Sequence, residues 1–199
     1  ADNFVGRQIL AVMVEPIKSE FAVSDTAIGL ISGLAFAAVY ALMGLPAGRL
    51  VDRMPRIRLL AMSCLLWAVA TMACGLAGSF LALAFARMLV AVSESPTTSA
   101  SLSLIADLYP PQRRSFAISC FTAAPTFSSI IGLSIGAWVV EHYGWRSAFI
   151  ALGVPALVFS AILAFVVRDP QRGRWDLTPH PHSQPALLGM RAEARKLWA

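Results

Sequence analysis

The sequence has few charged residues for its length. Asp, Glu, Lys and Arg make up 14% of the 199 residues, against a hydrophobic fraction of 57% and a mean hydropathy of +0.68. These values lie far from those of soluble domains. Residues 27–48 and 59–77 carry no charge at all, and each stretch approaches the roughly 20 residues that a helix needs to cross a bilayer. The sequence is therefore that of a membrane protein.

Residues that bind metals are also scarce. The three cysteines, Cys64, Cys74 and Cys120, lie in apolar stretches without metal-ligand spacing, so we interpret them as packing residues. His180 and His182 form a His-x-His pair within a proline-rich tail. Two solvated histidines are favoured there over a metal site. We therefore predict no metal and no cofactor.

Basic residues outnumber acidic ones, and the net charge is +5. The arginines cluster beside apolar stretches rather than on a polar face, so binding to anionic lipid headgroups is favoured over binding to nucleic acid. A membrane-embedded enzyme using Ser93 or Ser95 is disfavoured, because no expected span contains a lysine or histidine to activate a serine.

Six apolar stretches are expected to form membrane helices. The first is the least hydrophobic, because it includes Arg7 and Glu15. Ser24 and Pro111 supply helix-start residues for the second and the fifth. The sequence thus predicts an all-α membrane protein with a six-helix bundle over residues 1–170. The expected helices cover residues 4–17, 27–50, 59–77, 80–105, 115–140 and 147–167.

Arginines gather in alternate connections between these stretches. Because cytoplasmic loops retain Lys and Arg, we expect a cytoplasmic N-terminus in a multi-pass protein of the plasma or inner membrane. The residues after 170 become rich in proline and then alternate apolar with basic residues, which predicts a cytoplasmic linker (171–199) with a short amphipathic helix. The cytoplasmic arginines are Arg49, Arg53, Arg56, Arg58, Arg113, Arg114, Arg168, Arg172 and Arg174, and the other side has Lys18 and Arg146.

Three charged residues fall inside the expected spans and away from the helix ends where Glu15 and Arg49 lie. Arg7 lies in the first, and Arg87 and Glu94 lie in the fourth, seven residues apart on one helix face. A charge at the bilayer centre costs about 2.5–3.5 kcal/mol on insertion scales. We therefore interpret the three as parts of a substrate or proton pathway, with Arg7 facing Glu94 across a cavity. The alternative is an internal ion pair that only fastens helices together.

Hydroxyl side chains surround Glu94 and recur in the fifth stretch. Side chains of this kind form hydrogen bonds between helices or face water. We expect four of them to line a wet cavity, namely Ser93, Thr97, Thr122 and Thr126. Close packing of helices is the alternative, and a ridge of small residues suited to it is formed by Ser128, Gly132 and Gly136.

Residues 48–58 resemble the signature loop between helices two and three of major facilitator superfamily transporters. Residues 144–149, Gly-Trp-Arg-Ser-Ala-Phe, resemble the usual start of that family's helix six. The resemblance implies the N-terminal half of a twelve-helix fold, in which the loop gates the cytoplasmic side by contacting a helix of the second half. Pro55 stands where the family commonly has glycine. The matching gating-loop residues are Gly48, Asp52, Arg53 and Arg56.

A narrower resemblance is to the Spinster branch, including its bacterial members, over about residues 3–170. It rests on residues 7–10, 15–18 and 24–30, on Glu94, and on the Asp-Leu-Tyr-Pro-Pro-Gln-Arg-Arg segment at 107–114. Spinster-like proteins are lipid transporters associated with lysophospholipids and sphingosine-1-phosphate. The resemblance therefore implies a lipid-like substrate and proton coupling. It places Arg7 and Glu94 in the coupling centre and Arg87 in the same polar network.

One position departs from the Spinster pattern. The family usually has an aspartate directly before the arginine of helix one, and this chain has Gly6, natural or engineered, in that place. Alternating access also requires a second bundle, so we expect a C-terminal six-helix bundle that is absent from this chain.

The expected function is that of a proton-coupled secondary transporter that moves a lysophospholipid or sphingolipid-like amphiphile by alternating access. The alternative is the same fold exporting or importing a small organic anion or drug. A scaffold without transport activity is a further alternative. The expected partners are the substrate, protons, membrane lipids and the second half of the same protein.

Overall fold

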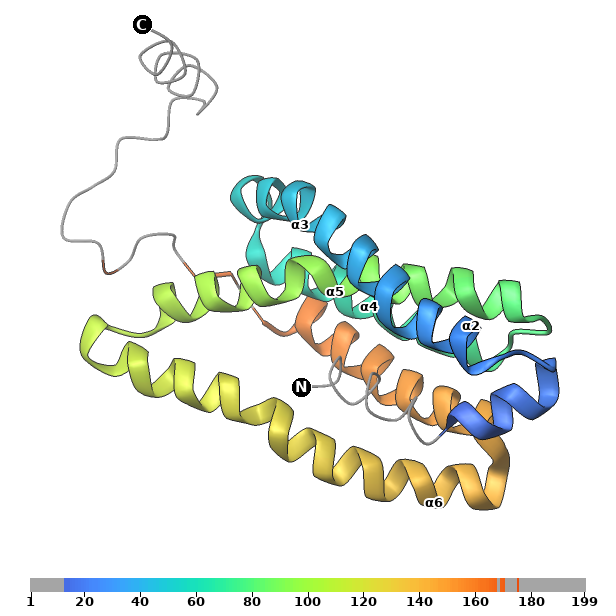
Figure 1. Ribbon diagram of the computed structural model, residues 1–199. Helices are drawn as coiled ribbons and strands as arrows, with labels where there is room; N and C mark the ends of the chain where they lie inside the picture. Colours follow the sequence, from blue (N-terminus) through green and yellow to red (C-terminus); the bar gives the residue numbers. More distant parts are fainter. Residues whose placement is uncertain (1–12, 168, 171–174, 176–199) are drawn as a thin grey trace, which may run out of the picture.

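The computed structural model describes residues 13–167, 169, 170 and 175, and this part of the chain is helical apart from short connections (Figure 1). Residues 13–21 are helical and are here called the first helix. The second expected span is a continuous helical run, Asp25–Arg53. It consists of α2 (Asp25–Gly29), the π-helix η1 (Leu30–Ala35) and α3 (Phe36–Arg53).

The start of this run was predictable. Ser24 is the N-cap of α2, and its hydroxyl oxygen accepts a hydrogen bond from the Ala27 amide over 3.2 Å. A capped first turn satisfies one of the amide groups that have no partner within the helix. The prediction of Ser24 as a helix-start residue is confirmed.

Within the described residues, four helices are long and apolar enough to cross a membrane, not six. The predicted count of six is therefore wrong for this part of the chain, for two reasons. The first expected span, residues 4–17, falls mostly outside the described residues. The fifth and sixth expected spans belong to one helix, α6 (Pro111–Phe165).

The longest helix, α6, reverses direction along its length (Figure 1). Its 55 residues would extend roughly 80 Å as a straight helix, against the ~30 Å of a hydrocarbon core. Gly144 has φ 79° and ψ 165°, a non-helical backbone that favours glycine. The reversal divides α6 into a first arm (residues 111–143) and a second arm (residues 145–165), which correspond to the fifth and sixth expected spans.

The middle of the bundle is formed by α4 (Arg56–Gly75) and α5 (Phe80–Leu108). In each of these two helices, 50% of the most apolar 18-residue stretch is buried. The corresponding share is 11% in Asp25–Arg53 and 28% in α6. The largest buried side chains include Trp67 on α4 and Phe149 on the second arm. The lightly buried helices therefore present their apolar side chains outward.

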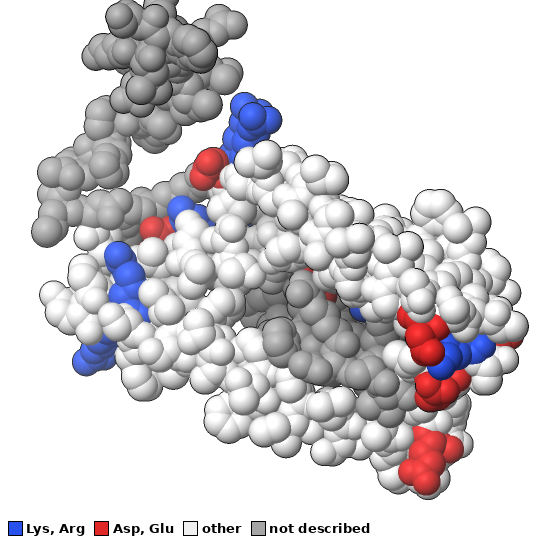
Figure 2. Space-filling model, viewed as in Figure 1, with Lys and Arg blue, Asp and Glu red and all other residues white. Residues whose placement is uncertain are grey.

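Charged side chains gather at the ends of the molecule. Figure 2 shows them mainly at opposite ends of one face, and most of the described surface between these ends is uncharged. Arginines of the α3–α4 and α5–α6 connections define one end, here called the arginine end. The opposite end has Glu15, Lys18, Glu20, Asp25 and Arg146.

A close approach of two helices occurs where α4 ends. A Cβ atom added at Gly75 would lie 2.7 Å from the Arg146 carbonyl oxygen and 3.1 Å from the Phe149 Cβ atom. The nearest atom belongs to backbone and cannot swing aside. The absence of a side chain at Gly75 therefore allows α4 to contact the start of the second arm.

We expect Gly75→Ala to lower the free energy of unfolding by about 1–3 kcal/mol, because overpacking forces backbone shifts. Gly44→Ala is the matched control, since a Cβ atom at Gly44 would meet nothing within 4 Å, and it should leave stability unchanged or raise it. Thermal and denaturant unfolding of the purified protein in detergent measures both. Equal stability of the two variants would contradict the close approach.

Candidate functional site

Two buried ionisable side chains lie on α5. Arg87 and Glu94 are each 3% exposed, and two turns of helix separate them. The Arg87 guanidinium lies 5.4 Å from the centre of the Phe36 ring on α3, within cation–π range. The Trp67 indole N–H on α4 donates to Glu94 Oε1 over 3.3 Å. The charged stripe predicted from the sequence thus faces the bundle interior and is contacted from both neighbouring helices.

The hydroxyl groups around Glu94 contact backbone carbonyls. The Ser93 hydroxyl donates to the Val90 carbonyl over 2.7 Å, and the Thr97 hydroxyl donates to the Ser93 carbonyl over 3.3 Å. The Ser95 hydroxyl donates to the Tyr40 carbonyl on α3 over 3.4 Å. These bonds satisfy the hydroxyl donors, and the last also joins α5 to α3.

The other predicted site residues lie apart from this cluster or outside the described residues. Thr122 and Thr126 are exposed on the first arm of α6, and the Thr122 hydroxyl donates to the Ile118 carbonyl of its own helix. Their role as cavity-lining residues, with Ser93 and Thr97, stays a prediction. Gly6 and Arg7 lie outside the described residues, as do the linker and its expected amphipathic helix.

An ion pair at the arginine end joins Arg56, at the start of α4, to Asp107, near the end of α5. Their side chains are 13% and 8% exposed, respectively, so the pair is largely removed from water. Sequence reasoning assigned Arg56 to the gating loop and missed Asp107. A signal was present in the sequence, because Asp107 is an acidic residue three positions before a Pro-Pro pair, and the 48–58 segment carries four arginines.

The remaining gating-loop residues are more open. Asp52 and Arg53 are exposed, and Gly48 is half-buried. A Cβ atom added at Gly48 would meet no atom within 4 Å. Among the described residues, no other helix therefore approaches Gly48 closely.

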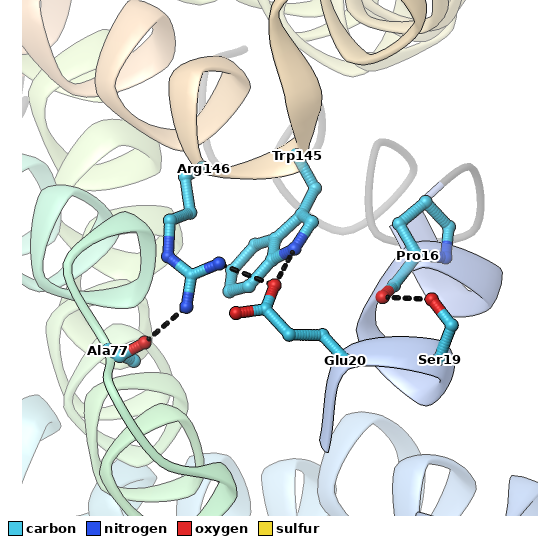
Figure 3. Close-up of polar contacts among 6 residues, drawn as sticks. All are labelled: Pro16, Ser19, Glu20, Ala77, Trp145 and Arg146. Carbon is cyan, nitrogen blue, oxygen red and sulfur yellow. Dashed lines mark hydrogen bonds and ion pairs between the residues drawn. The ribbon is translucent and has the colours of Figure 1, made fainter. Parts of the chain in front are cut away.

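A second polar cluster lies at the opposite end (Figure 3). The Glu20 carboxylate of the first helix accepts hydrogen bonds from the Trp145 indole N–H, over 2.8 Å, and from the Arg146 guanidinium. A second nitrogen of Arg146 donates to the Ala77 carbonyl over 2.9 Å, in the α4–α5 turn. The guanidinium also lies 4.2 Å from the centre of the Trp145 ring. This cluster ties together the first helix, the α4–α5 turn and the second arm of α6.

Hydrogen bonds from Arg146, and then from Trp145, hold the pKa of Glu20 below its usual 4.5. A lowered pKa in the folded state means that the stabilising contribution is present at neutral pH. It is lost as the pH falls below 4.5 and through the lowered pKa.

We expect Glu20→Gln to lower stability at neutral pH and to reduce the difference in stability between neutral pH and pH values below 4.5. The neutral amide keeps a hydrogen-bond acceptor but no longer titrates. Thermal unfolding of both proteins across this pH range measures the effect. Parallel stability curves for the two proteins would show that Glu20 does not contribute to the acid sensitivity.

The sequence pattern of the family described as the Major Facilitator Superfamily matches residues 2–198. The chain is 36% identical over 165 residues to an MFS-type efflux pump of Mycolicibacterium smegmatis, covering 83% of this chain and 38% of the pump. It is 27% identical over 176 residues to a probable galactarate/D-glucarate transporter of Bacillus subtilis, covering 85% of this chain and 38% of that protein. The chain belongs to the Major Facilitator Superfamily.

A solved structure supports the same assignment. A bacterial homologue of the human lysosomal transporter Spinster, in an inward-facing and occupied conformation, matches with a TM-score of 0.79 at 30% identity. The match covers 97% of this chain and 47% of the homologue. The chain thus spans less than half the length of these three relatives.

Family membership confirms the coarser predictions. The chain is part of an integral, multi-pass membrane protein with an all-helical fold, and it is not an enzyme. Within the part of the chain that the structure describes, no three His, Cys, Asp or Glu side chains gather as metal ligands.

Proposed function

We propose that this chain is the N-terminal half of a secondary transporter that moves a small organic anion or drug-like solute by alternating access. The observation that carries the proposal is the buried Arg87–Glu94 stripe on α5, because ionisable groups at membrane depth mark substrate and ion pathways. Family membership supports transport, and the 38–47% of each relative that the chain covers supports a partner bundle of similar size.

The relatives favour an organic anion over a lipid as substrate. They include an efflux pump and a probable galactarate/D-glucarate transporter, and the sugar diacids of the latter carry carboxylates. A guanidinium is the side chain best suited to bind a carboxylate through two parallel hydrogen bonds. In this proposal Arg87, together with Arg7, binds the anionic group of the substrate.

Glu94 is the proposed proton carrier. Its carboxyl group is buried and bonded to Trp67, so it exchanges its proton only when the transporter exposes it to water. Gly6 occupies the place of the aspartate that Spinster-like proteins have on helix one, which leaves this task to α5. Ser93, Thr97, Thr122 and Thr126 are proposed to line the route.

The gating loop completes the proposal. Asp52 and Arg53 are exposed beside the Arg56–Asp107 pair, and we expect Gly48 and these residues to contact a helix of the second half. A cytoplasmic location of the arginine end, and with it a cytoplasmic N-terminus, follows from retention of arginine on that side.

A lipid-like amphiphile is the second candidate substrate, and the likeness to the Spinster homologue favours it. That likeness covers 97% of this chain at 30% identity. An amphiphile would place its anionic headgroup at Arg87 and its tail among the apolar side chains of the bundle.

Uptake by proteoliposomes that contain the full-length protein tests both candidates. Labelled glucarate should be transported, and an excess of lysophospholipid should not compete if the substrate is a small anion. Uptake of labelled lysophospholipid with no transport of sugar acids would replace the first candidate with the second. Absence of transport for every organic anion, drug and lysolipid tested would contradict the proposed function.

A further inference from the structure

A pocket of about 320 Å³ opens between α4 and the second arm of α6 at the arginine end. This volume lies within the range of small-molecule sites. Arg58, Met62 and Leu65 line it from one face of α4, since residues three and four apart on a helix are neighbours. Val167 and Asp169 line it from the chain that leaves the second arm.

The walls of the pocket are apolar and open to the surroundings. Met62 and Leu65 are 53% and 48% exposed, although they lie on a membrane-spanning helix. A hydrogen bond joins the two helices at the pocket, where the Ser160 hydroxyl donates to the Ala61 carbonyl over 2.9 Å. Ser160 is buried, so its donor is satisfied, and the exposed walls suit a hydrocarbon chain.

Two side chains of opposite charge line the pocket at the arginine end. Arg58 belongs to the first turn of α4, and Asp169 follows the second arm; both are exposed. The structure records no ion pair between these two described side chains. The pocket therefore combines an apolar body with one cationic and one anionic group at the arginine end.

We propose that this pocket binds a membrane phospholipid whose headgroup carries both a phosphate and a primary ammonium, as phosphatidylethanolamine does. The phosphate contacts the Arg58 guanidinium, which suits phosphate geometry, and the ammonium contacts the Asp169 carboxylate. One acyl chain lies along Met62 and Leu65. The lipid comes from the leaflet at the arginine end, and it stays bound as a structural partner rather than a transported substrate.

The charge pattern distinguishes this lipid from an anionic one. Arginine alone would suit any phosphate headgroup, and basic pockets between helices bind anionic lipids. Asp169 would repel a headgroup that lacks a compensating ammonium. The site is separate from Arg87 and Glu94, and its test does not depend on the transport proposal.

Native mass spectrometry of the full-length protein tests the site, with phosphatidylethanolamine and phosphatidylglycerol of matched acyl chains as probes. Wild-type protein should retain phosphatidylethanolamine in preference to phosphatidylglycerol. Arg58→Gln should reduce this retention roughly tenfold, the fold-change expected for one charge-assisted hydrogen bond. Asp169→Asn should shift the preference toward phosphatidylglycerol.

Two control pairs separate the site from general effects of charge and bulk. Arg113→Gln removes an exposed arginine that does not line the pocket, and it should leave retention unchanged. Met62→Trp should fill the pocket and displace the lipid, whereas Val69→Trp, on the same helix but outside the pocket, should not. Thermal unfolding confirms that each variant is folded.

Several results would overturn the proposal. Tighter binding of phosphatidylglycerol by wild-type protein would identify an anionic-lipid site instead. Equal retention by the Arg58→Gln and Arg113→Gln variants, or no loss with Met62→Trp, would show that the retained lipid binds elsewhere on the full-length protein.

Discussion

Glu94→Gln is expected to reduce uptake driven by a pH gradient to the level of protein-free liposomes, while exchange of labelled for unlabelled substrate continues. Glutamine keeps the size and the acceptor oxygen that Trp67 contacts at Glu94, but it releases no proton. Exchange moves no net proton, so it does not need the carboxyl group. Both assays use the full-length protein in proteoliposomes with and without an imposed gradient.

The control for this prediction is Glu15→Gln. Glu15 is exposed and pairs with Lys18 on the first helix, so its replacement should leave both assays unchanged. Uptake driven by a pH gradient that persists in the Glu94→Gln variant would remove Glu94 as the proton carrier. Loss of exchange as well would assign Glu94 to substrate binding instead.

The second large effect is expected at the Arg56–Asp107 pair. Asp107→Asn removes the carboxylate opposite a guanidinium that is only 13% exposed, and breaking a buried pair in this way costs about 3–5 kcal/mol. The junction of α4 with α5 at the arginine end should therefore loosen. Thermal unfolding in detergent measures the loss, and proteolysis within the α5–α6 connection should become faster.

An exposed ion pair provides the comparison. Lys18 Nζ lies 2.6 Å from Asp25 Oδ1, and the Asp25 side chain is 76% exposed. Asp25→Asn should therefore lower the free energy of unfolding by at most about 1 kcal/mol. The double replacement Arg56→Met and Asp107→Leu should recover much of the loss, because it leaves no buried charge without a counter-ion. A double variant no more stable than Asp107→Asn would show that the pair contributes more than mutual neutralisation.

Hydropathy predicted which parts of the chain form membrane helices, because the cost of leaving backbone groups unpaired in lipid forces each apolar stretch into a helix. It placed the helix ends less well. The fourth stretch was expected to end at residue 105, but α5 continues to Leu108. The helix continues through the charged Asp107, because that carboxylate pairs with Arg56, which lies 51 residues earlier in the sequence.

Sequence reasoning found the interior charges but not their neighbours. Arg87 and Glu94 were evident, since charges are rare in apolar stretches. The contact of Glu94 with Trp67, 27 residues away, depends on how α4 is rotated about its axis, and no local pattern fixes that rotation. Arg146 was counted only as a loop charge, because its partner Glu20 lies 126 residues away.

The π-helical segment η1 determines where this part of the chain can lose a residue without disturbing later contacts. A π-helical turn holds one residue more than an α-helical turn, so the six residues Leu30–Ala35 contain a surplus that the helix absorbs locally. Losing one residue there would restore regular winding and leave Phe36 beside the Arg87 guanidinium. The same loss within α4 would turn every later side chain by about 100°, carrying Trp67 away from Glu94. Length variation among close relatives should therefore be tolerated in η1 and excluded from the first three turns of α4.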